Sequence, residues 1–389
     1  MSTTVAAVLF AAVLAYALFG GADFGAGFWE LTAGEGEAGQ RPRRAIEKSI
    51  GPVWEANHVW LIFVFVVLWT SFPEAYASIM LTLFVPLTLA ALGVVLRGAS
   101  FAFRKTVDVT RDRRVLGRAF ALSSLLVPYF LGAVAGGIAS GRVPAGGKAG
   151  DPVDSWVNPT SALGGTLAVA AVAYLAAVYL VWDARRLGDA EMARYFRRRA
   201  IGAAVAVAAV GLVGVAVLRA DARYLFDGLT SDALPLVILS VLSGGGALGL
   251  LLRDAARGAR LLAVLAVASV MGAWAVAQWP YVLPESLTFA AAAAPTGTLT
   301  AVLVAFGLAV VLVVPGFVLL YVLDQKGLLP EEGVADVGDP TPVGPSAAEE
   351  RPPVESSRPG VGGGSVVPPP RKAGPARRAQ DRRTTVEDP

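Results

Sequence analysis

Long apolar segments follow one another along almost the whole chain. Nine stretches have roughly the 20 mostly apolar residues that a helix needs to cross a bilayer. They occupy about residues 4–28, 50–72, 75–97, 117–140, 160–182, 200–218, 233–252, 260–279 and 299–324. Each stretch is continuously apolar, whereas the strands of a membrane barrel alternate apolar and polar positions over about ten residues. The pattern predicts an all-α fold, a polytopic transmembrane helical bundle of about nine spans.

Lys and Arg gather in every second loop between these segments. The clusters lie at 41–48, 104–114, 185–199 and 253–260, and the loops between them carry few basic residues. Because cytoplasmic loops are enriched in Lys and Arg, we expect the N-terminus outside and the C-terminus in the cytoplasm. This orientation requires an odd number of spans, which nine satisfies.

The composition changes abruptly after Gln325. Residues 1–326 are expected to form one membrane domain of helical bundles. Residues 327–389 are rich in Pro, Gly and Arg, with almost no aromatic side chains. Such a segment cannot bury enough apolar surface to offset its ordering entropy, so it is predicted to be a disordered cytoplasmic tail.

The overall composition limits which cofactors and cross-links this chain can hold. Hydrophobic residues make up 55% of the chain and charged residues 16%, with a mean hydropathy of +0.60. There is no cysteine and only one histidine, His58, which excludes disulfides, Fe–S clusters and bis-His haem ligation within this chain. Because the basic residues follow the loops, the sequence pI of about 9.2 does not indicate nucleic-acid binding.

Asp23 lies inside the first apolar segment. It sits among Gly20, Gly21, Gly25 and Gly27, and small residues of this kind let helices approach closely. A packing face explains the glycines but needs no carboxylate. A charge near the centre of a membrane helix costs about 2.5–3.5 kcal/mol, so Asp23 is a candidate functional residue. At five residues from the expected helix end it would lie roughly 8 Å deep.

A second polar group lies at the start of the second apolar segment. Glu55 is expected at a depth similar to that of Asp23, and His58, three residues later, shares its helix face. Asn57 is offset from that face. A carboxylate and an imidazole in line from the cytoplasm are the parts of a proton relay. A buried hydrogen-bonded cluster that holds helices together is an equal alternative on these residues alone.

Three further features carry weaker expectations. Arg97, near the inner end of the third segment, is expected to reach the interface or bind lipid phosphate. The less favoured alternative is that Arg97 is the counter-ion of an intramembrane acid. Glu74 is expected to face solvent in a short outside turn. Residues 274–288 contain two prolines and predict an outside loop that is partly re-entrant.

Four sequence motifs resemble one family of membrane proteins. They are GGADFGAGFWEL (20–31), SIGPVWEANHVWLI (49–62), FPEAYAS (72–78) and WPYVLPESLTFAAAAAPTGTL (279–299). In this order, over about residues 5–326, they look like subunit II of the cytochrome bd-type quinol oxidases. The resemblance does not cover the tail.

The resemblance implies an oxidoreductase that oxidises quinol and reduces dioxygen to water in the aerobic respiratory chain. It implies a heterodimer in the cytoplasmic (inner) cell membrane. In this heterodimer the partner, subunit I, ligates haem b and haem d, while subunit II carries no redox ligands. Membrane lipid is a further expected partner, and a small accessory subunit is another candidate. Some members hold a structural quinone in subunit II.

The resemblance also bears on the candidate residues. The position of Glu55 is associated in this family with proton uptake from the cytoplasm, and some members have Asp there. Asn57 matches a recurrent Asn, His58 stands where some members have Gln, and Asp23 matches the acid of the first motif. The main hypothesis is a non-haem-ligating subunit that supports the haem subunit and conducts protons through Asp23, Glu55, Asn57 and His58. The alternatives are a proton-coupled secondary transporter and a purely structural membrane scaffold.

Overall fold

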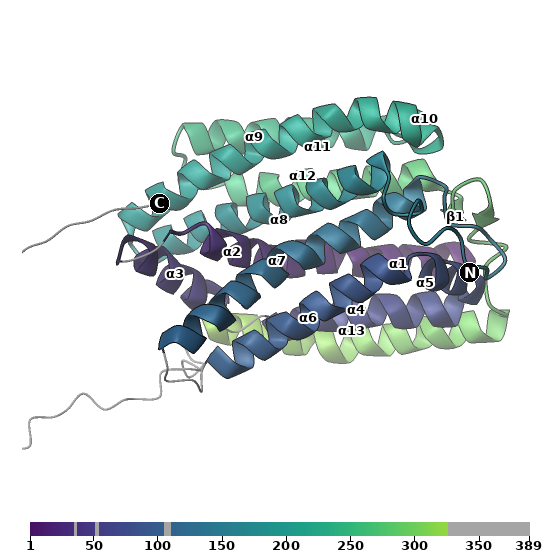
Figure 1. The fold of residues 1–389 in the computed structure, drawn as a ribbon, viewed down its shortest axis with the longest axis horizontal. Helices are drawn as coiled ribbons and strands as arrows, with labels where there is room; N and C mark the ends of the chain where they lie inside the picture. Colours follow the sequence, from purple (N-terminus) through teal and green to yellow (C-terminus); the bar gives the residue numbers. More distant parts are fainter. Residues whose placement is uncertain (35–36, 51–53, 105–109, 326–389) are drawn as a thin grey trace, which may run out of the picture. The chain divides into compact units, whose positions relative to one another are not determined.

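The computed structural model describes residues 1–34, 37–50, 54–104 and 110–325, with backbone alone for 54–57 and for some other residues near the gaps and within the last helix. The predicted tail, 327–389, lies outside the described residues. The chain is mostly helical, as its apolar pattern predicts (Figure 1). The elements in order are α1 (Ser2–Ala15), η1 (Tyr16–Gly20), α2 (Gly21–Leu31), α3 (Glu37–Ile50), α4 (Trp54–Ser71), α5 (Pro73–Thr82), α6 (Phe84–Arg104), α7 (Thr110–Ala139), α8 (Pro159–Arg186), α9 (Ala190–Asp221), α10 (Arg223–Thr230), α11 (Leu234–Leu252), α12 (Ala259–Gln278), β1 (Tyr281–Leu283), β2 (Leu287–Thr288) and α13 (Thr296–Gln325).

Eight of the nine predicted spans each overlap one helical segment, and the third, 75–97, falls on two helices, α5 and α6. Among the described residues, seven helical segments are long and apolar enough to cross a membrane. An eighth counts only if α4 and α5, which are bent by 120° at their junction, form one span. The apolar part of α6 covers Phe84–Ser100. The chain is therefore a multi-span membrane protein, and the number nine stays a prediction.

The third predicted span, 75–97, had the wrong start. Residues 73–82 form the separate helix α5, and the continuous helix α6 begins only at Phe84. Pro73 stands at the start of α5, where its missing N–H costs no helical hydrogen bond, and Leu83 ends that helix outside helical geometry. Pro86 falls in the first turn of α6, which also tolerates proline. Apolar content alone hides this break, because α5 is nearly as apolar as α6.

Residues 281–288 form a short antiparallel hairpin, β1–β2, in place of the re-entrant segment expected there. Its residues Val282, Leu283 and Leu287 are buried in a cluster with Phe72 and Leu83. The side-chain amide of Gln278 donates to the carbonyl of Val282 at 3.1 Å. The hairpin therefore closes over the junction between α4, α5 and α6.

Glycines set the spacing of the central helices. On α7 and α8, Gly132 and Gly164 face each other so closely that a Cβ on either would collide with the backbone of the other. Gly136 approaches the backbone of Thr160 in the same way. Small residues at such positions bring helix backbones into direct contact, which favours association inside a membrane.

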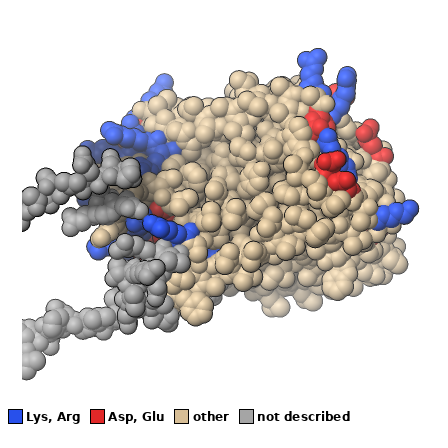
Figure 2. Space-filling model, in the orientation of Figure 1, with Lys and Arg blue, Asp and Glu red and all other residues tan. Residues whose placement is uncertain are grey.

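On the face shown in Figure 2, charged side chains lie at the two ends of the bundle, with an uncharged band between them. At one end, which we call the basic end, lie α3, the end of α8, the start of α9 and the loop 253–258 (Figure 1). There Asp254 pairs with Arg185 and, at 2.9 Å, with Arg197. At the opposite end Arg142 binds Asp221 at 2.6 Å. The backbone N–H and hydroxyl of Thr160, in the first turn of α8, also donate to Asp221.

The close approach of α7 and α8 yields a prediction. Gly132→Val should lower the thermal midpoint of the purified protein, because overpacking a tight contact typically costs about 1–3 kcal/mol. Gly202→Val on α9 is the matched control, since a Cβ at Gly202 meets nothing within 4 Å. An equal effect of the two variants would contradict the packing argument.

The pair network of Asp254 yields a pH prediction. Hydrogen bonding to Arg197, with the nearby charges of Arg197 and Arg185, holds the pKa of the Asp254 carboxyl below its usual range. A carboxyl whose pKa is lower in the folded protein stabilises the fold at pH values above its unfolded-state pKa of about 3.9. This stabilisation is lost as the pH falls through the folded-state pKa. Because Asp254 is 55% exposed, Asp254→Asn should cost less than about 1 kcal/mol at pH 7.

The destabilisation caused by Asp254→Asn should shrink as the pH falls below about 4. The measurement is the thermal midpoint of the variant and of the wild type from pH 7 to pH 3. The exposed Asp232, for which Asn is the same isosteric change, serves as control. A difference between Asp254→Asn and wild type that grows as the pH falls would refute the assignment.

Candidate functional site

Asp23 lies on α2 immediately after a π-helical turn. In that turn, η1, the amide of Gly21 donates to the carbonyl of Tyr16, five residues earlier. Single π-turns inside α-helices occur frequently at functional sites. The carboxylate of Asp23 is buried, with 7% of the residue exposed. Because α2 runs on to Leu31, Asp23 lies eight residues, or about 12 Å, from the helix end, deeper than its sequence suggested.

The partner of Asp23 is Arg97 of α6. The guanidinium Nη2 lies 2.6 Å from Oδ1 of Asp23 and also donates to the backbone carbonyl of Asp23 at 3.2 Å. Arg97 is the largest fully buried side chain among the described residues, with 1% exposed. The favoured expectation, that Arg97 extends to the interface or to lipid phosphate, was wrong. The alternative, a counter-ion for an intramembrane acid, is confirmed.

Residues of α7 hold the other side of the guanidinium. Nη1 of Arg97 donates to the hydroxyl of Ser124, and that hydroxyl donates to the carbonyl of Phe120 at 2.7 Å. The guanidinium carbon lies 4.1 Å from the ring centroid of Phe120 and 4.8 Å from that of Phe24, within the range of a cation–π interaction. One arginine therefore connects α2, α6 and α7.

The glycines around Asp23 make this connection possible. A Cβ at Gly27 would collide with the side chain of Ser124 and press on Arg97. A Cβ at Gly25 would collide with the backbone of Val172 on α8. Trp29, on the same helix, donates from its indole N–H to the carbonyl of Ala173 at 2.8 Å. The packing face predicted for these glycines is present. It also makes room for Arg97 and Ser124 beside the carboxylate of Asp23.

Three buried polar atoms of this site have no hydrogen-bond partner in the described part of the chain. They are Oδ2 of Asp23, Nε of Arg97 and the phenol oxygen of Tyr16. Tyr16 and Phe24 contact each other edge to face, with ring centroids 6.3 Å apart. Orphaned polar groups are costly in an apolar interior, and internal water commonly satisfies them. The site can therefore offer one free carboxylate oxygen to a proton-bearing group.

The structure places His58 near the ion pair of Asp23 and Arg97. His58, on α4, is half-buried and meets the ring of Phe24 edge to face, with centroids 6.4 Å apart. Phe24 is the residue after Asp23 and also packs on Arg97. His58 and Arg97, the partner of Asp23, thus contact the same aromatic side chain.

The other two candidates fall where the description of side chains stops. Glu55 and Asn57 belong to the first turn of α4, which begins at Trp54, but their side chains lie outside the described residues. The helix was expected to begin near Ile50, five residues before Glu55. Residue 50 instead ends α3. The depth predicted for Glu55 therefore does not follow from the helix boundary.

Sequence reasoning missed some members of the site. Ser124 and Phe120 carry no signal of their own in the apolar run of α7. Glu30 is a buried acid of α2, with 7% exposed, but it stood beyond the predicted end of the first span. Arg97 could have been assigned, because a permanent cation within an apolar segment requires an anionic or polar partner.

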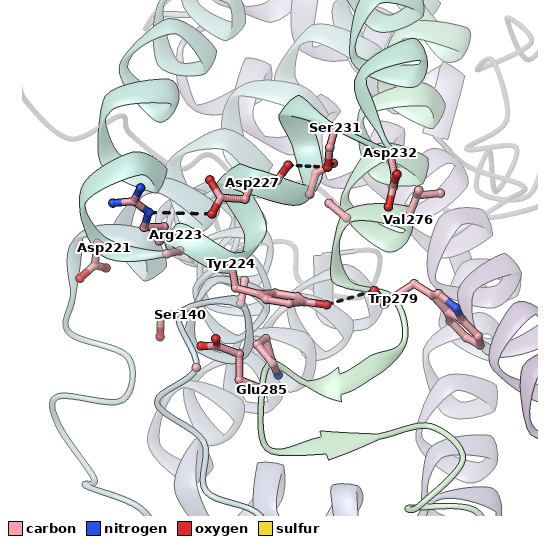
Figure 3. Close-up of a pocket in the computed structure, with 16 residues that line it drawn as sticks. Ser140, Asp221, Arg223, Tyr224, Asp227, Ser231, Asp232, Val276, Trp279 and Glu285 are labelled. Atoms are coloured by element: carbon pink, nitrogen blue, oxygen red, sulfur yellow. Dashed lines mark hydrogen bonds and ion pairs between the residues drawn. The ribbon is translucent and has the colours of Figure 1, made fainter.

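A cavity at the end of the bundle opposite the basic end holds none of the predicted residues (Figure 3). Its volume is about 540 Å³, and Asp227, Asp232 and Glu285 contribute carboxylates to its lining. Tyr224 lies across it and donates its hydroxyl to the carbonyl of Trp279 at 3.1 Å. Within the described residues, no three His, Cys, Asp or Glu side chains are grouped to hold a metal ion. The cavity therefore presents an open acidic surface.

The ion pair yields a prediction. Asp23→Asn and Arg97→Gln should each destabilise the protein by about 3–5 kcal/mol, because each leaves one buried charge or donor set without its partner. The double variant should lose less than the sum of the two. The measurement is a double-mutant cycle on thermal midpoints, with the exposed Asp154→Asn as control. Additive losses would show that the two side chains do not act as a pair.

Comparison with known proteins identifies a family whose members this chain resembles in sequence and fold. The family model described as cytochrome bd terminal oxidase subunit II matches residues 1–324. The solved structure of the bd oxidase from Geobacillus thermodenitrificans contains a chain that aligns with a TM-score of 0.66 and 26% identity. That alignment covers 84% of this chain and 98% of that one.

Two curated relatives are similar over shorter stretches. Cytochrome bd ubiquinol oxidase subunit 2 of Bacillus subtilis is 31% identical over 146 residues, which cover 37% of this chain and 42% of the relative. Cytochrome bd-I ubiquinol oxidase subunit 2 of Escherichia coli strain K12 is 26% identical over 129 residues, 33% of each chain. These alignments span less than half of the relatives' length. The match of the family model over residues 1–324 shows that the chain belongs to the cytochrome bd terminal oxidase subunit II family.

Proposed function

We propose that this chain is the non-haem subunit of a bd-type quinol:oxygen oxidoreductase in an aerobic respiratory chain. In this role it stabilises the haem-bearing subunit I and conducts protons from the cytoplasm toward the oxygen-reducing site. The support is the family match over residues 1–324 and the structural match to a bd oxidase chain over nearly its whole length. Family membership favours this role over the proton-coupled transporter.

The haems of such a complex do not fit this chain. His58 is its one imidazole and there is no cysteine, and the ring of His58 is engaged at the edge of Phe24. Two b-type haems and one d-type haem need more axial ligands than that. We therefore assign haem b and haem d, with quinol oxidation, to the partner subunit. No redox step is assigned to residues of this chain.

The orientation completes the proposal. The basic end of the bundle faces the cytoplasm, because Lys and Arg are enriched in cytoplasmic loops. α4 begins at that end, so Glu55 and Asn57 belong to the first turn of a helix that rises from the cytoplasm. His58 follows in the next turn, against Phe24. The expected membrane is the cytoplasmic membrane, with the tail in the cytoplasm.

The four candidate residues then take different roles. Glu55 takes up the proton, and Asn57 and His58 orient the water that carries it. Asp23 is tied to Arg97 by a contact of 2.6 Å, so we assign it the role of a fixed hydrogen-bond acceptor rather than a proton carrier. Its free Oδ2 accepts a hydrogen bond from that water. The observation that carries this division is the contact of His58 and Arg97 with one side chain, Phe24.

The test is Glu55→Gln in the assembled complex. Quinol oxidase turnover should fall about tenfold or more, since a positioned proton-transfer group contributes roughly 10²–10⁴-fold. Haem content and thermal midpoint should stay at their wild-type values. Glu47→Gln, an exposed carboxylate on α3 near the same end, is the matched control and should leave turnover unchanged.

Three outcomes separate this proposal from its rivals. Normal turnover with normal haem content in Glu55→Gln would eliminate the relay role. Loss of assembly, with normal turnover in the complex that remains, would indicate a structural scaffold. Purification of the chain without a haem-bearing partner would contradict the oxidase assignment as a whole.

A further inference from the structure

A group of aromatic and basic side chains at the basic end is not used by the proposed proton path. Tyr179, Trp182 and Arg186 lie on α8 at positions i, i+3 and i+7, so they form one stripe on that helix. Arg260, in the first turn of α12, lies across the stripe. We call these four residues the arginine–indole site. The exposed Arg257 precedes Arg260 by three residues.

Arg260 is oriented by two rings. Its guanidinium carbon lies 4.6 Å from the ring centroid of Tyr179 and 4.7 Å from that of Trp182. The guanidinium carbon of Arg186 lies 5.4 Å from the same Trp182 ring. Two guanidinium groups thus approach one indole. Arg260 also donates a hydrogen bond to the hydroxyl of Tyr179. The ring contacts fix the plane of its guanidinium, and its remaining N–H groups are available to bind an anion.

The acids nearby do not balance this charge. Asp254 is engaged by Arg185 and Arg197, and Asp183 lies one turn before Arg186 on α8. Within the described part of the chain, Arg253, Arg257 and Arg260 form no ion pair with a carboxylate, and Arg257 is exposed. The region therefore keeps an excess of positive charge beside an interfacial Trp and Tyr.

Exposed leucines follow Arg260 along α12. Leu261 and Leu265, one turn apart, are 72% and 37% exposed. Leu252, at the end of α11, is 58% exposed. A cation at the helix start, an aromatic layer and an exposed aliphatic stripe follow one another in the order in which a phospholipid presents phosphate, glycerol and acyl chain. A free phosphate ion would use only the first of these.

We propose that the arginine–indole site binds the phosphate of an anionic phospholipid, with an acyl chain lying along Leu261 and Leu265. Arg260 and Arg257 donate hydrogen bonds to the phosphate oxygens, as arginine does in other phosphate sites. A zwitterionic phosphatidylcholine binds less well, because its trimethylammonium group brings a positive charge toward the arginines. The bound lipid belongs to the leaflet at the basic end.

The test uses the purified, complete complex in nanodiscs of phosphatidylcholine that carry a small share of photoreactive phosphatidylglycerol, with the reactive group in the acyl chain. Peptide mapping should find the crosslink on α12 near Leu261 and Leu265. Unlabelled phosphatidylglycerol should suppress that crosslink, and added phosphatidylcholine should not.

Two variants of one loop region sharpen the test. Arg260→Gln should lower the crosslink yield by roughly tenfold, because it removes the oriented guanidinium. Arg253→Gln removes one positive charge from the same region, but Arg253 makes no ring contact in the described structure, so the yield should change by less than about twofold. Where Arg260→Gln fails to assemble, lipid competition on the wild-type complex decides.

Three results would overturn the proposal. Equal losses in Arg260→Gln and Arg253→Gln would show a diffuse field rather than a site. Displacement of the probe by inorganic phosphate as effectively as by phosphatidylglycerol would indicate an ion site. A crosslink absent from the start of α12 in the wild-type complex would show that another chain covers this surface.

Discussion

The ion pair between Asp23 and Arg97 governs the arrangement of the helices around it. In an apolar bundle a charge that loses its partner has no water to replace it, so the two side chains must meet. Arg97 also binds the carbonyl of Asp23 and the hydroxyl of Ser124. The relative height of α2, α6 and α7 is therefore fixed by one guanidinium, and sliding any of these helices by one turn would separate charge from countercharge.

The ion pair can form only because small residues let the helices approach closely. Gly27 makes room for Ser124 and Arg97, and Gly25 brings α2 against the backbone of α8. Gly132, Gly136 and Gly164 then hold α7 against α8. The core of the membrane domain is thus built from backbones in close contact, with the ion pair lying inside that contact rather than in a polar cleft.

The sequence predicted the helices well and the site in part. Continuous apolar runs located most of the long helices, because burial in lipid imposes the same pattern on each. The start of α6 was missed, because the break at Leu83 interrupts a run whose hydropathy does not change. The prolines of residues 274–288 predicted a loop, but not that part of it pairs into the hairpin β1–β2. Asp23 was identified because a charged side chain within a membrane-spanning helix has a high free-energy cost. Ser124 was not, because a serine in an apolar helix carries no signal until its neighbour across the bundle is known.

The π-helical turn Tyr16–Gly20 has a consequence for how this chain tolerates change in length. Each residue of a regular α-helix advances about 100° around the axis, and a wide turn absorbs one extra residue before the helix resumes. The residues of α2 are therefore shifted by one position relative to the periodicity of α1, while the two helices continue as one span. Removing the extra residue from this turn would restore a regular helix with the aspartate still directed toward the arginine. An insertion or deletion elsewhere in α1 or α2 has no wide turn to absorb it, and would rotate one helix face relative to the other by about 100°. The turn is therefore the part of the first span in which a change of one residue in length does least harm.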